Sequence, residues 1–92
     1  MDDKASGIVM YSTEFCSYCA AARMLLTKKG LAYEDILVSG DPDKRAEMER
    51  RSGRRTVPQI FINGRSIGGF DELYALDKEG RLDDMLAEPA DG

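Results

Sequence analysis

The chain has 92 residues, of which 42% are hydrophobic and 33% charged, and its formal net charge is −4. This composition is typical of a small globular protein, and we expect a single domain over residues 1–92 with an ordered core over about residues 6–87. The negative charge argues against general nucleic-acid binding, and no apolar run approaches the roughly 18 residues that a membrane-spanning helix needs.

The first part of the chain predicts a strand, a helix and a second strand. Residues 7–11, GIVMY, form a short apolar run that is typical of a buried strand. A helix is expected over residues 17–29, because apolar residues recur there at helical spacing, and Gly30 would end it. This apolar stripe consists of Ala21, Ala22, Leu25 and Leu26. Residues 32–38, AYEDILV, predict a strand parallel to the first, which completes a βαβ unit.

The next segment, GDPDKRAEMERRSG, has the residues that begin and end a helix. Asp41 is suited to the N-cap, Pro42 to the first helical position and Gly53 to the C-terminal end. The apolar stripe of this helix is thin and contains only Ala46 and Met48. We therefore expect the helix to pack lightly at an edge of the domain.

The last part of the chain predicts a hairpin and two helices. QIFI and RSIG flank Asn63-Gly64, the preferred pair for a two-residue type I′ turn. Asp71 and Glu72 open a helix that ends at Gly80, and a short helix follows with Leu82, Met85 and Leu86 on its apolar face. The tail EPADG is expected to be disordered. The order β-α-β-α-β-β-α-α predicts an α/β fold, with one four-stranded mixed sheet and helices on both faces.

The only two cysteines, Cys16 and Cys19, are three positions apart, and three kinds of site use such a pair. A zinc site needs four ligands, and the chain has no histidine and no third cysteine to supply them. A structural disulfide closing so short a loop would stabilise little, and the polar start MDDKASG is unlike a secretory signal, so we expect a reducing compartment. A redox dithiol is favoured, because C-x-x-C lies beside a βαβ pattern.

The predicted helix gives the two cysteines different roles. Cys16 comes just before the helix, where the unpaired N–H groups of the first turn and the helix dipole favour a thiolate. We therefore expect a depressed pKa for Cys16. Cys19 lies one turn into the helix on the same face, so it should be more buried and less acidic. The pair would then consist of an attacking and a resolving thiol, as disulfide exchange requires.

Charge is distributed unevenly along the chain. Residues 44–55, KRAEMERRSGRR, carry a net charge of +4, whereas the segments before and after them are negative. Two interpretations are equally open at this point. The basic segment is either a solvated helix face or a site for a small anionic ligand.

Four motifs in order, CSYC, TVPQIFING, IGGFDEL and YALDKEGRLDDML, resemble the glutaredoxins along nearly the whole chain. The resemblance is to small bacterial-type dithiol glutaredoxins, which have a thioredoxin-like fold. It implies an enzyme that reduces protein disulfides and glutathione mixed disulfides, with glutathione as the electron donor. It also implies a monomer located in the cytoplasm, with no membrane or nucleic-acid partner. A reductase such as ribonucleotide reductase is one implied protein partner.

The resemblance assigns a role to each matching residue. Cys16 would be the nucleophile that carries the glutathione mixed disulfide, and Cys19 would resolve it. The implied glutathione-binding residues are Thr13, Tyr18, Arg45, Thr56, Val57, Pro58, Gly69, Phe70 and Asp71. In this family the proline of the T-V-P motif follows a cis peptide bond. Taken without the resemblance, the simpler interpretations are favoured, in which Pro58 starts a strand and Gly68-Gly69 forms a tight turn.

Three positions depart from the usual family pattern. Ser17 replaces a proline inside the cysteine motif, Thr13 replaces a frequent lysine before it, and Phe70 replaces a frequent cysteine. Without the lysine, the thiolate of Cys16 loses one stabilising charge. Some relatives with serine at this point hold a [2Fe–2S] cluster between two subunits, each giving one cysteine and one glutathione, and Cys16 would be the ligand here.

Two alternatives to the glutathione-dependent enzyme therefore stay open. One is a carrier that binds an iron–sulfur cluster through Cys16. The other is a redoxin of similar fold that takes electrons from thioredoxin reductase without glutathione. Arg45, Asp71 and the basic segment argue against this second alternative, because they suit a ligand that carries both carboxylates and an ammonium group.

Overall fold

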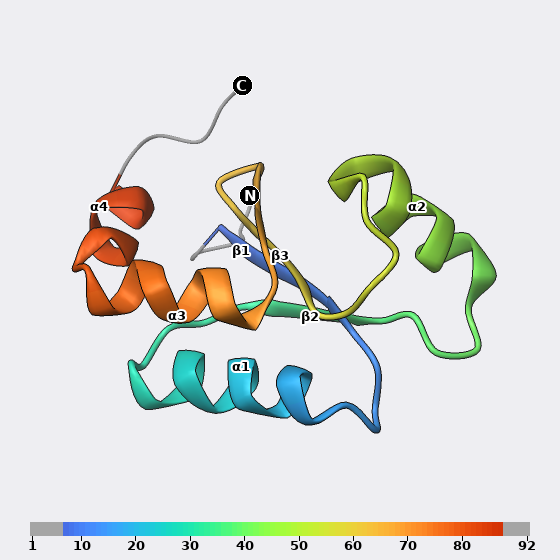
Figure 1. Ribbon diagram of the computed structural model, residues 1–92, viewed down its shortest axis with the longest axis horizontal. Coiled ribbons are helices and arrows are strands. Elements are labelled where there is room, and N and C mark those ends of the chain that lie inside the picture. The colour runs from blue at the N-terminus through green and yellow to red at the C-terminus, as the bar shows by residue number, and fades with distance from the viewer. Residues whose placement is uncertain (1–6, 88–92) are drawn as a thin grey trace.

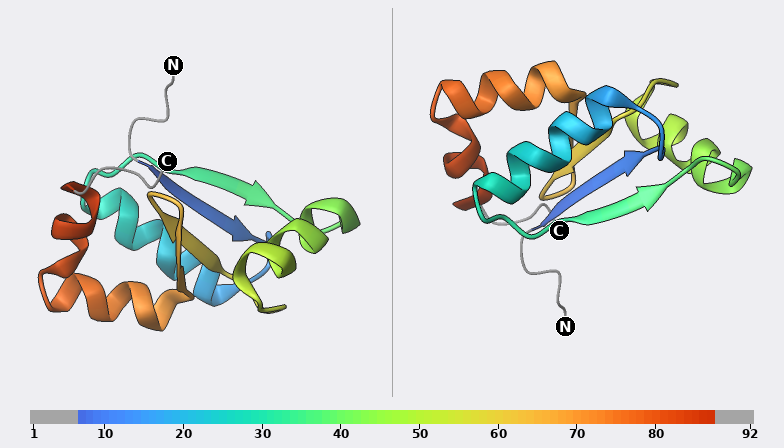
Figure 2. Two further views of the ribbon diagram at one scale, coloured as in Figure 1. Left: turned by 90° about the horizontal axis from the view of Figure 1, so that it is seen from above. Right: turned by 90° about the horizontal axis from the view of Figure 1, so that it is seen from below.

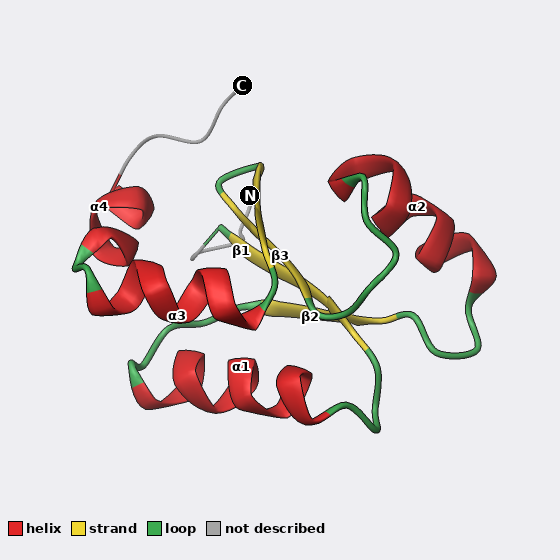
Figure 3. Ribbon diagram, in the orientation of Figure 1, coloured by secondary structure: helices red, strands yellow, loops and turns green. Residues whose placement is uncertain are grey.

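The computed structural model describes residues 7–87 and contains four strands and four helices in the predicted order (Figures 1 and 3). The elements are β1 (Ile8–Ser12), α1 (Ser17–Lys28), β2 (Glu34–Leu37), α2 (Pro42–Ser52), β3 (Gln59–Ile62), β4 (Arg65–Gly68), α3 (Phe70–Lys78) and α4 (Arg81–Ala87). Each predicted element is found, with its ends displaced by a few residues at most. The expected disordered tail, residues 88–92, and the first residue of the expected ordered core, residue 6, lie outside the described residues.

The four strands form one mixed sheet in the order β2-β1-β3-β4. β1 pairs with β2 in parallel and with β3 in antiparallel orientation, and β3 pairs with β4 as a hairpin. The hairpin turns at Asn63 and Gly64, whose φ angles of 51° and 86° are both positive. A type I′ turn requires this conformation at both central positions, so the prediction from the Asn-Gly pair is confirmed.

Helices cover both faces of the sheet, as Figures 1 and 2 show. Alternate residues of β1 and β3 point to opposite faces, since side chains alternate along a strand. α1 and α3 lie side by side on one face, over a core that includes Ile8, Met10, Ala22, Leu26, Ile60, Ile62, Leu73 and Leu82. α2 covers the other face, where Tyr11, Val38, Met48 and Phe61 form a second, smaller cluster. The α/β prediction with helices on both faces is therefore confirmed.

α2 packs lightly against the sheet, as expected, but through one buried apolar side chain instead of two. Met48 is fully buried, but Ala46 is exposed, so the predicted apolar stripe is wrong at that position. Polar contacts supplement Met48. The hydroxyl of Tyr11 on β1 donates to Glu47 and accepts a hydrogen bond of 2.6 Å from Arg51, whose guanidinium lies 4.3 Å from the ring centroid of Phe61. The helix is thus joined to the sheet by a hydrogen-bonded tyrosine and a cation–π contact.

None of the helices in the described part of the chain is long and apolar enough to cross a membrane. The carboxyl end of β1 leads directly into the loop that carries the first cysteine, and the helix α1 follows at once. The sheet therefore places both cysteines at one end of the domain, beside the loop that precedes β3.

Candidate active site

Cys16 occupies the N-cap position of α1, and Cys19 lies in the first turn of the same helix. The backbone N–H of Cys19 donates a hydrogen bond of 3.2 Å to the sulfur of Cys16. Cys16 is partly accessible, whereas Cys19 is 0% exposed. Both cysteines are free thiols in this structure. The expected difference between an accessible and a buried thiol is confirmed.

The two thiols also differ in acidity. Burial opposes ionisation of Cys16, but hydrogen bonds from Cys19, from the N–H of Tyr18 and from the hydroxyl of Thr13 together hold the pKa of Cys16 below its ordinary value. Burial and the hydrogen bond with Cys16 raise the pKa of Cys19 to about 11. Cys16 is therefore the more acidic of the two thiols.

Thr13 contacts both cysteines from the loop that joins β1 to α1. Its hydroxyl lowers the pKa of Cys16, and its backbone N–H lowers the pKa of Cys19 against the burial that raises it. Both contacts favour the thiolate form of the sulfur that they reach. The hydroxyl of Thr13 therefore compensates in part for the lysine that this position lacks.

The loop before β3 lies opposite the two cysteines. Its peptide bond between Val57 and Pro58 is cis, as the resemblance implied. The carbonyl oxygen of Val57 is 3.9 Å from the sulfur of Cys16. Pro58 is buried, and Gln59 begins β3 directly after it. The loop therefore brings its backbone against the reactive sulfur and is anchored by the central part of the sheet.

A hollow of about 290 Å³ extends from this loop to the start of α3. Seven of the nine residues that the resemblance assigned to glutathione line it: Tyr18, Thr56, Val57, Pro58, Gly69, Phe70 and Asp71. Its remaining lining residues are Arg54, Gln59 and Glu72. The fold therefore brings three separate segments of the chain to one site beside Cys16.

The start of α3 supplies backbone donors to this hollow. Glu72 accepts a hydrogen bond of 2.8 Å from the N–H of Gly69, which caps the helix. The next N–H groups, of Phe70 and Asp71, lie in the first helical turn and have no intrahelical acceptor. A Cβ atom on Gly69 would lie 3.2 Å from the carbonyl oxygen of Pro58, so a side chain there would crowd the loop. The two elements that border the hollow thus pack closely through a glycine.

A sequence model of the glutaredoxin family matches residues 8–67, which contain both cysteines and the T-V-P loop. Glutaredoxin 3 of Escherichia coli (strain K12) is 48% identical over 81 residues, which are 88% of this chain and 98% of that protein. The chain belongs to the glutaredoxin family. It is accordingly a glutathione-dependent thiol–disulfide oxidoreductase, and the resemblance noted from its motifs is confirmed.

Solved glutaredoxin structures have the same fold. The crystal structure of a buckwheat glutaredoxin–glutathione complex superposes with a TM-score of 0.80 at 32% identity, covering 89% of this chain and 77% of that one. The solution structure of glutaredoxin from Brucella melitensis has a TM-score of 0.75 at 49% identity and covers 86% of each chain. The predicted thioredoxin-like fold is confirmed by these similarities.

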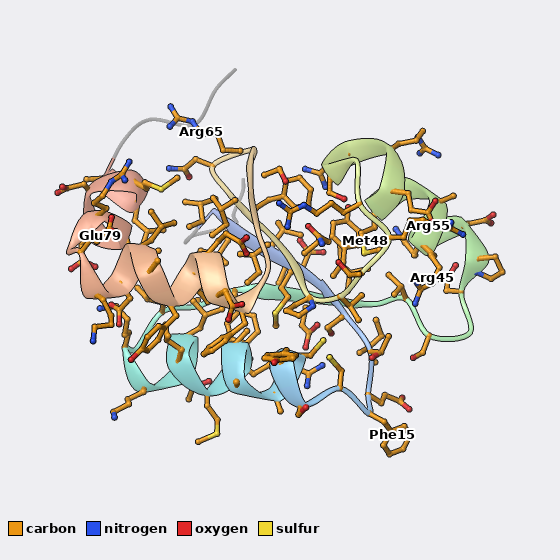
Figure 4. All side chains as sticks on the ribbon, viewed as in Figure 1. Phe15, Arg45, Met48, Arg55, Arg65 and Glu79 are labelled. Carbon is orange, nitrogen blue, oxygen red and sulfur yellow. The ribbon has the colours of Figure 1, made fainter. Side chains whose placement is uncertain are left out.

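Two residues that the family resemblance assigned to glutathione do not line the hollow of this glutaredoxin. Thr13 lies under the cysteines instead, as described above. Arg45 donates a hydrogen bond of 3.0 Å to the carbonyl oxygen of Arg55, and Figure 4 shows the two residues close together beside α2. Arg45 therefore holds the segment after α2, which continues into the T-V-P loop.

The arginines of the basic segment, residues 44–55, make different contacts. Arg51 packs against β1 and β3, and Arg55 is 3.9 Å from Glu49. Among residues 7–87, Arg54 is the one basic residue that lines the hollow, where it is 3.8 Å from the carboxylate of Glu72. Sequence reasoning did not single out Arg54, although the excess of positive charge in residues 44–55 was the signal that could have found it.

Arg23 and Asp35 were also missed. Arg23 is four residues after Cys19, so it lies one turn further along the same face of α1. It forms an ion pair of 2.7 Å with Asp35 on β2. The i,i+4 spacing from Cys19 could have suggested Arg23, but its partner on another strand could not be read from the sequence.

Proposed function

We propose that this glutaredoxin uses Cys16 as the nucleophile and Cys19 as the resolving thiol, and that it binds glutathione in the hollow between the T-V-P loop and α3. The single observation that carries this proposal is the environment of the Cys16 sulfur. It accepts the N–H of Cys19 at 3.2 Å, has a lowered pKa and lies 3.9 Å from the Val57 carbonyl at the edge of the hollow.

The reduction of a glutathione mixed disulfide needs only Cys16. Its thiolate attacks the glutathione sulfur of the substrate, so that a Cys16–glutathione disulfide forms and the substrate leaves as a thiolate that takes a proton from water. The thiolate of a second glutathione then attacks the sulfur of the bound glutathione. Glutathione disulfide leaves, and Cys16 returns to its thiolate. One glutathione thiol is consumed for each substrate disulfide reduced, and the glutathione disulfide contains its sulfur and the glutathione sulfur that came from the substrate.

The reduction of a protein disulfide uses both cysteines. Cys16 forms a mixed disulfide with one sulfur of the substrate, and the other sulfur leaves as a thiol. Cys19 then attacks the Cys16 sulfur, releases the substrate in its reduced form and leaves a Cys16–Cys19 disulfide. The N–H of Cys19 at the Cys16 sulfur shows that the two residues lie in contact across the first turn of α1. Two glutathione thiols then reduce this disulfide to the dithiol and leave as glutathione disulfide.

The charges around the hollow complement those of glutathione, which has two carboxylates and one ammonium group. Arg54 is the cation on one side, and Asp71 is an exposed anion at the start of α3. The N–H groups of Phe70 and Asp71 are suited to a carboxylate, because a helix N-terminus favours negative charge. We propose that the γ-glutamyl end of glutathione binds at the start of α3 and that Arg54 binds the glycine carboxylate. Arg45 would contribute indirectly, because it holds the segment after α2 that contains Arg54.

Two exposed aromatic side chains lie in sequence on either side of Cys16, and we propose that they contact protein substrates. Phe15 is 96% exposed and points away from the domain at the tip of the β1–α1 loop (Figure 4), and Tyr18 is 61% exposed. The substrates would be proteins with disulfides or glutathionylated cysteines, of which ribonucleotide reductase is one example. We propose that the enzyme acts as a monomer in the cytoplasm, because its dithiol must be kept reduced between turnovers.

A [2Fe–2S] carrier remains the second candidate function. No group of three or more potential metal ligands gathers within residues 7–87. Because Cys19 is buried, one copy offers a single accessible cysteine, Cys16. A cluster needs four ligands, so it would require two copies of the chain and two glutathione thiolates. Visible absorption of protein purified without oxygen tests this candidate.

The deciding experiment is turnover of a small glutathione mixed disulfide with one reductant at a time. With glutathione, glutathione reductase and NADPH, we expect NADPH to be consumed at a rate proportional to the enzyme concentration. With thioredoxin reductase and NADPH in place of glutathione, we expect no turnover. Turnover with thioredoxin reductase alone would contradict the proposal, and the Cys16→Ser variant is the blank for both reactions.

A further inference from the structure

A cluster of polar side chains lies beneath the two cysteines and joins α1 to the ends of β1 and β2. Arg23 on α1 is 2.7 Å from Asp35 on β2 through its Nε atom. Its Nη2 atom donates hydrogen bonds of 2.8 Å to the hydroxyl of Ser12 and 3.1 Å to the carbonyl oxygen of Thr13. The hydroxyl of Ser12 in turn donates to Asp35 at 2.5 Å. One guanidinium thus holds three segments of the chain together.

The position of this cluster separates it from the glutathione hollow. Ser12 is 0% exposed, whereas the side chains of Arg23 and Asp35 are each 26% exposed, so the cluster runs from the buried end of β1 to the surface. Its residues are absent from the lining of the hollow. Any effect of Arg23 on the reaction must therefore pass through the cysteines and the loop before them.

Thr13 connects the cluster to both sulfurs. Arg23 donates a hydrogen bond to the carbonyl oxygen of Thr13. The hydroxyl of Thr13 lowers the pKa of Cys16, and its backbone N–H lowers the pKa of Cys19. Arg23 is also a positive charge one helical turn from Cys19. Both the held N–H and the charge lower the pKa of Cys19 against the burial that raises it.

We propose that Arg23 is a positioning residue for the resolving step, in which it holds Thr13 against Cys19 and supplies the charge that favours the attacking thiolate. In this step the Cys19 thiolate attacks the sulfur of Cys16 in a Cys16–substrate disulfide. The bond between Cys16 and the substrate breaks, the Cys16–Cys19 bond forms, and the substrate leaves as a thiolate that takes a proton from water. The inference rests on the proposed function, because it needs Cys16 to carry a mixed disulfide.

The size of the expected effect follows from thiol chemistry. A pKa rise of one unit lowers the thiolate fraction about tenfold at neutral pH. The more basic thiolate is also a better nucleophile. With a Brønsted coefficient of about 0.5, its rate constant rises roughly threefold for each pKa unit, which recovers part of the loss. A rise of one unit in the pKa of Cys19, through loss of the charge and displacement of Thr13 together, should therefore slow the resolving step by about threefold.

The experiment measures the resolving step directly. Cys16 is first loaded with glutathione by a small glutathionylated reagent at low pH, and the pH is then raised. Release of glutathione is followed by acid quenching and mass spectrometry of the protein. We expect Arg23→Gln to release glutathione at least about threefold more slowly than the wild type, and Arg23→Lys, which keeps the charge, to be within about twofold of it. Lys28→Gln, an exposed residue in the last turn of α1, is the matched control and should release at the wild-type rate.

A second measurement distinguishes this role from general support of the loop. In a Cys19→Ser background, turnover of a small glutathione mixed disulfide depends on Cys16 alone, and we expect Arg23→Gln to slow it clearly less than it slows glutathione release in the dithiol enzyme. Equal slowing of this single-cysteine reaction and of glutathione release would overturn the inference, and so would an unchanged release rate in Arg23→Gln. Failure of Cys16 to accept glutathione in the wild type would instead contradict the proposed function itself.

Discussion

The backbone N–H of Cys19 points at the sulfur of Cys16 across 3.2 Å, so the buried residue of the pair stabilises the thiolate of the accessible one. This contact explains why two chemically identical side chains differ in acidity. The pKa of Cys16 lies below its ordinary value, although burial opposes this, whereas burial raises the pKa of Cys19 to about 11. The proposed roles of attacking and resolving thiol rest on this difference.

We predict that Cys16→Ser abolishes turnover of every disulfide substrate, while Cys19→Ser retains turnover of small glutathione mixed disulfides. The reason is that two steps need no second cysteine: the attack of Cys16 on the substrate, and the release of Cys16 from its glutathione disulfide by a second glutathione. The measurement is NADPH consumption coupled through glutathione reductase. Equal loss of activity in the two variants would show that the assignment of attacker and resolver is wrong.

The pH dependence of alkylation should report the lowered pKa of Cys16. The thiolate is the reactive form, so the rate rises as pH passes the pKa and is constant above it. In the Cys19→Ser variant we expect the midpoint of this rise to lie below the value of about 8.5 that is usual for a free cysteine. Thr13→Val removes the hydroxyl that reaches the Cys16 sulfur and should move the midpoint upward. A midpoint that Thr13→Val leaves in place would contradict this role of the hydroxyl.

The charged residues at the hollow should affect the binding of glutathione more than the free energy of unfolding. We predict that Arg54→Gln raises the Michaelis constant for glutathione by roughly tenfold at low salt, since a hydrogen bond between charged groups contributes about 1.5 kcal/mol. Asp71→Asn should act similarly on the ammonium end. Both effects should shrink as salt is added, because these side chains are exposed.

Arg50→Gln is the matched control for this prediction. Arg50 is an exposed residue of α2 in the same basic segment, and it is not among the residues that line the hollow. We expect its substitution to leave the Michaelis constant near that of the wild type. If Arg50→Gln and Arg54→Gln weaken glutathione use equally, the effect comes from net charge rather than from a localised contact.

Substitutions in α2 test how much its packing on the sheet contributes to the free energy of unfolding. Met48 is 0% exposed beneath α2, so we predict that Met48→Ala lowers the free energy of unfolding by about 2–5 kcal/mol. Ala46, two residues away on the same helix, is exposed, and Ala46→Ser should change the free energy of unfolding by less than about 0.5 kcal/mol. Urea denaturation followed by circular dichroism measures both. A larger loss from Ala46→Ser would contradict the observed orientation of α2.

Substitution of Phe15 should slow the reduction of protein substrates but not of small ones. We predict that Phe15→Ser lowers kcat/KM for a protein disulfide several-fold, because an exposed aromatic ring beside Cys16 loses its apolar contact with the substrate. Turnover of a small glutathione mixed disulfide should be unchanged, since Phe15 does not line the hollow. Parallel kinetics on the two substrates check this, and equal losses would exclude a role specific to proteins.

Local sequence signals were sufficient for the order and limits of the secondary structure. Asp41 caps α2, Pro42 opens it and Gly53 ends it at a φ of 74°, as their backbone preferences predict. These residues act on the backbone within a few positions of themselves. The same is true of the CSYC motif, whose place before a helix is enough to predict an accessible acidic thiol and a buried resolving one.

The contacts between distant segments could not be predicted in this way. Ala46 and Met48 are equally apolar in a list of residues, but only the packing of α2 on Tyr11 and Phe61 shows which of them is buried. Arg45 and Arg54 lie in one basic segment, yet the path of the chain after α2 turns Arg45 toward the Arg55 carbonyl and places Arg54 at the hollow.

The sequence by itself therefore determined the type of fold, the family and the chemistry of the two thiols, because those depend on local propensity and on the spacing of short motifs. Only the tertiary structure decided which charged residues lie at the hollow and which support the cysteines. Arg23 and Asp35 show the reason most clearly. Their ion pair depends on the parallel pairing of β1 and β2 and on the packing of α1 against the sheet, which bring residues twelve positions apart to 2.7 Å.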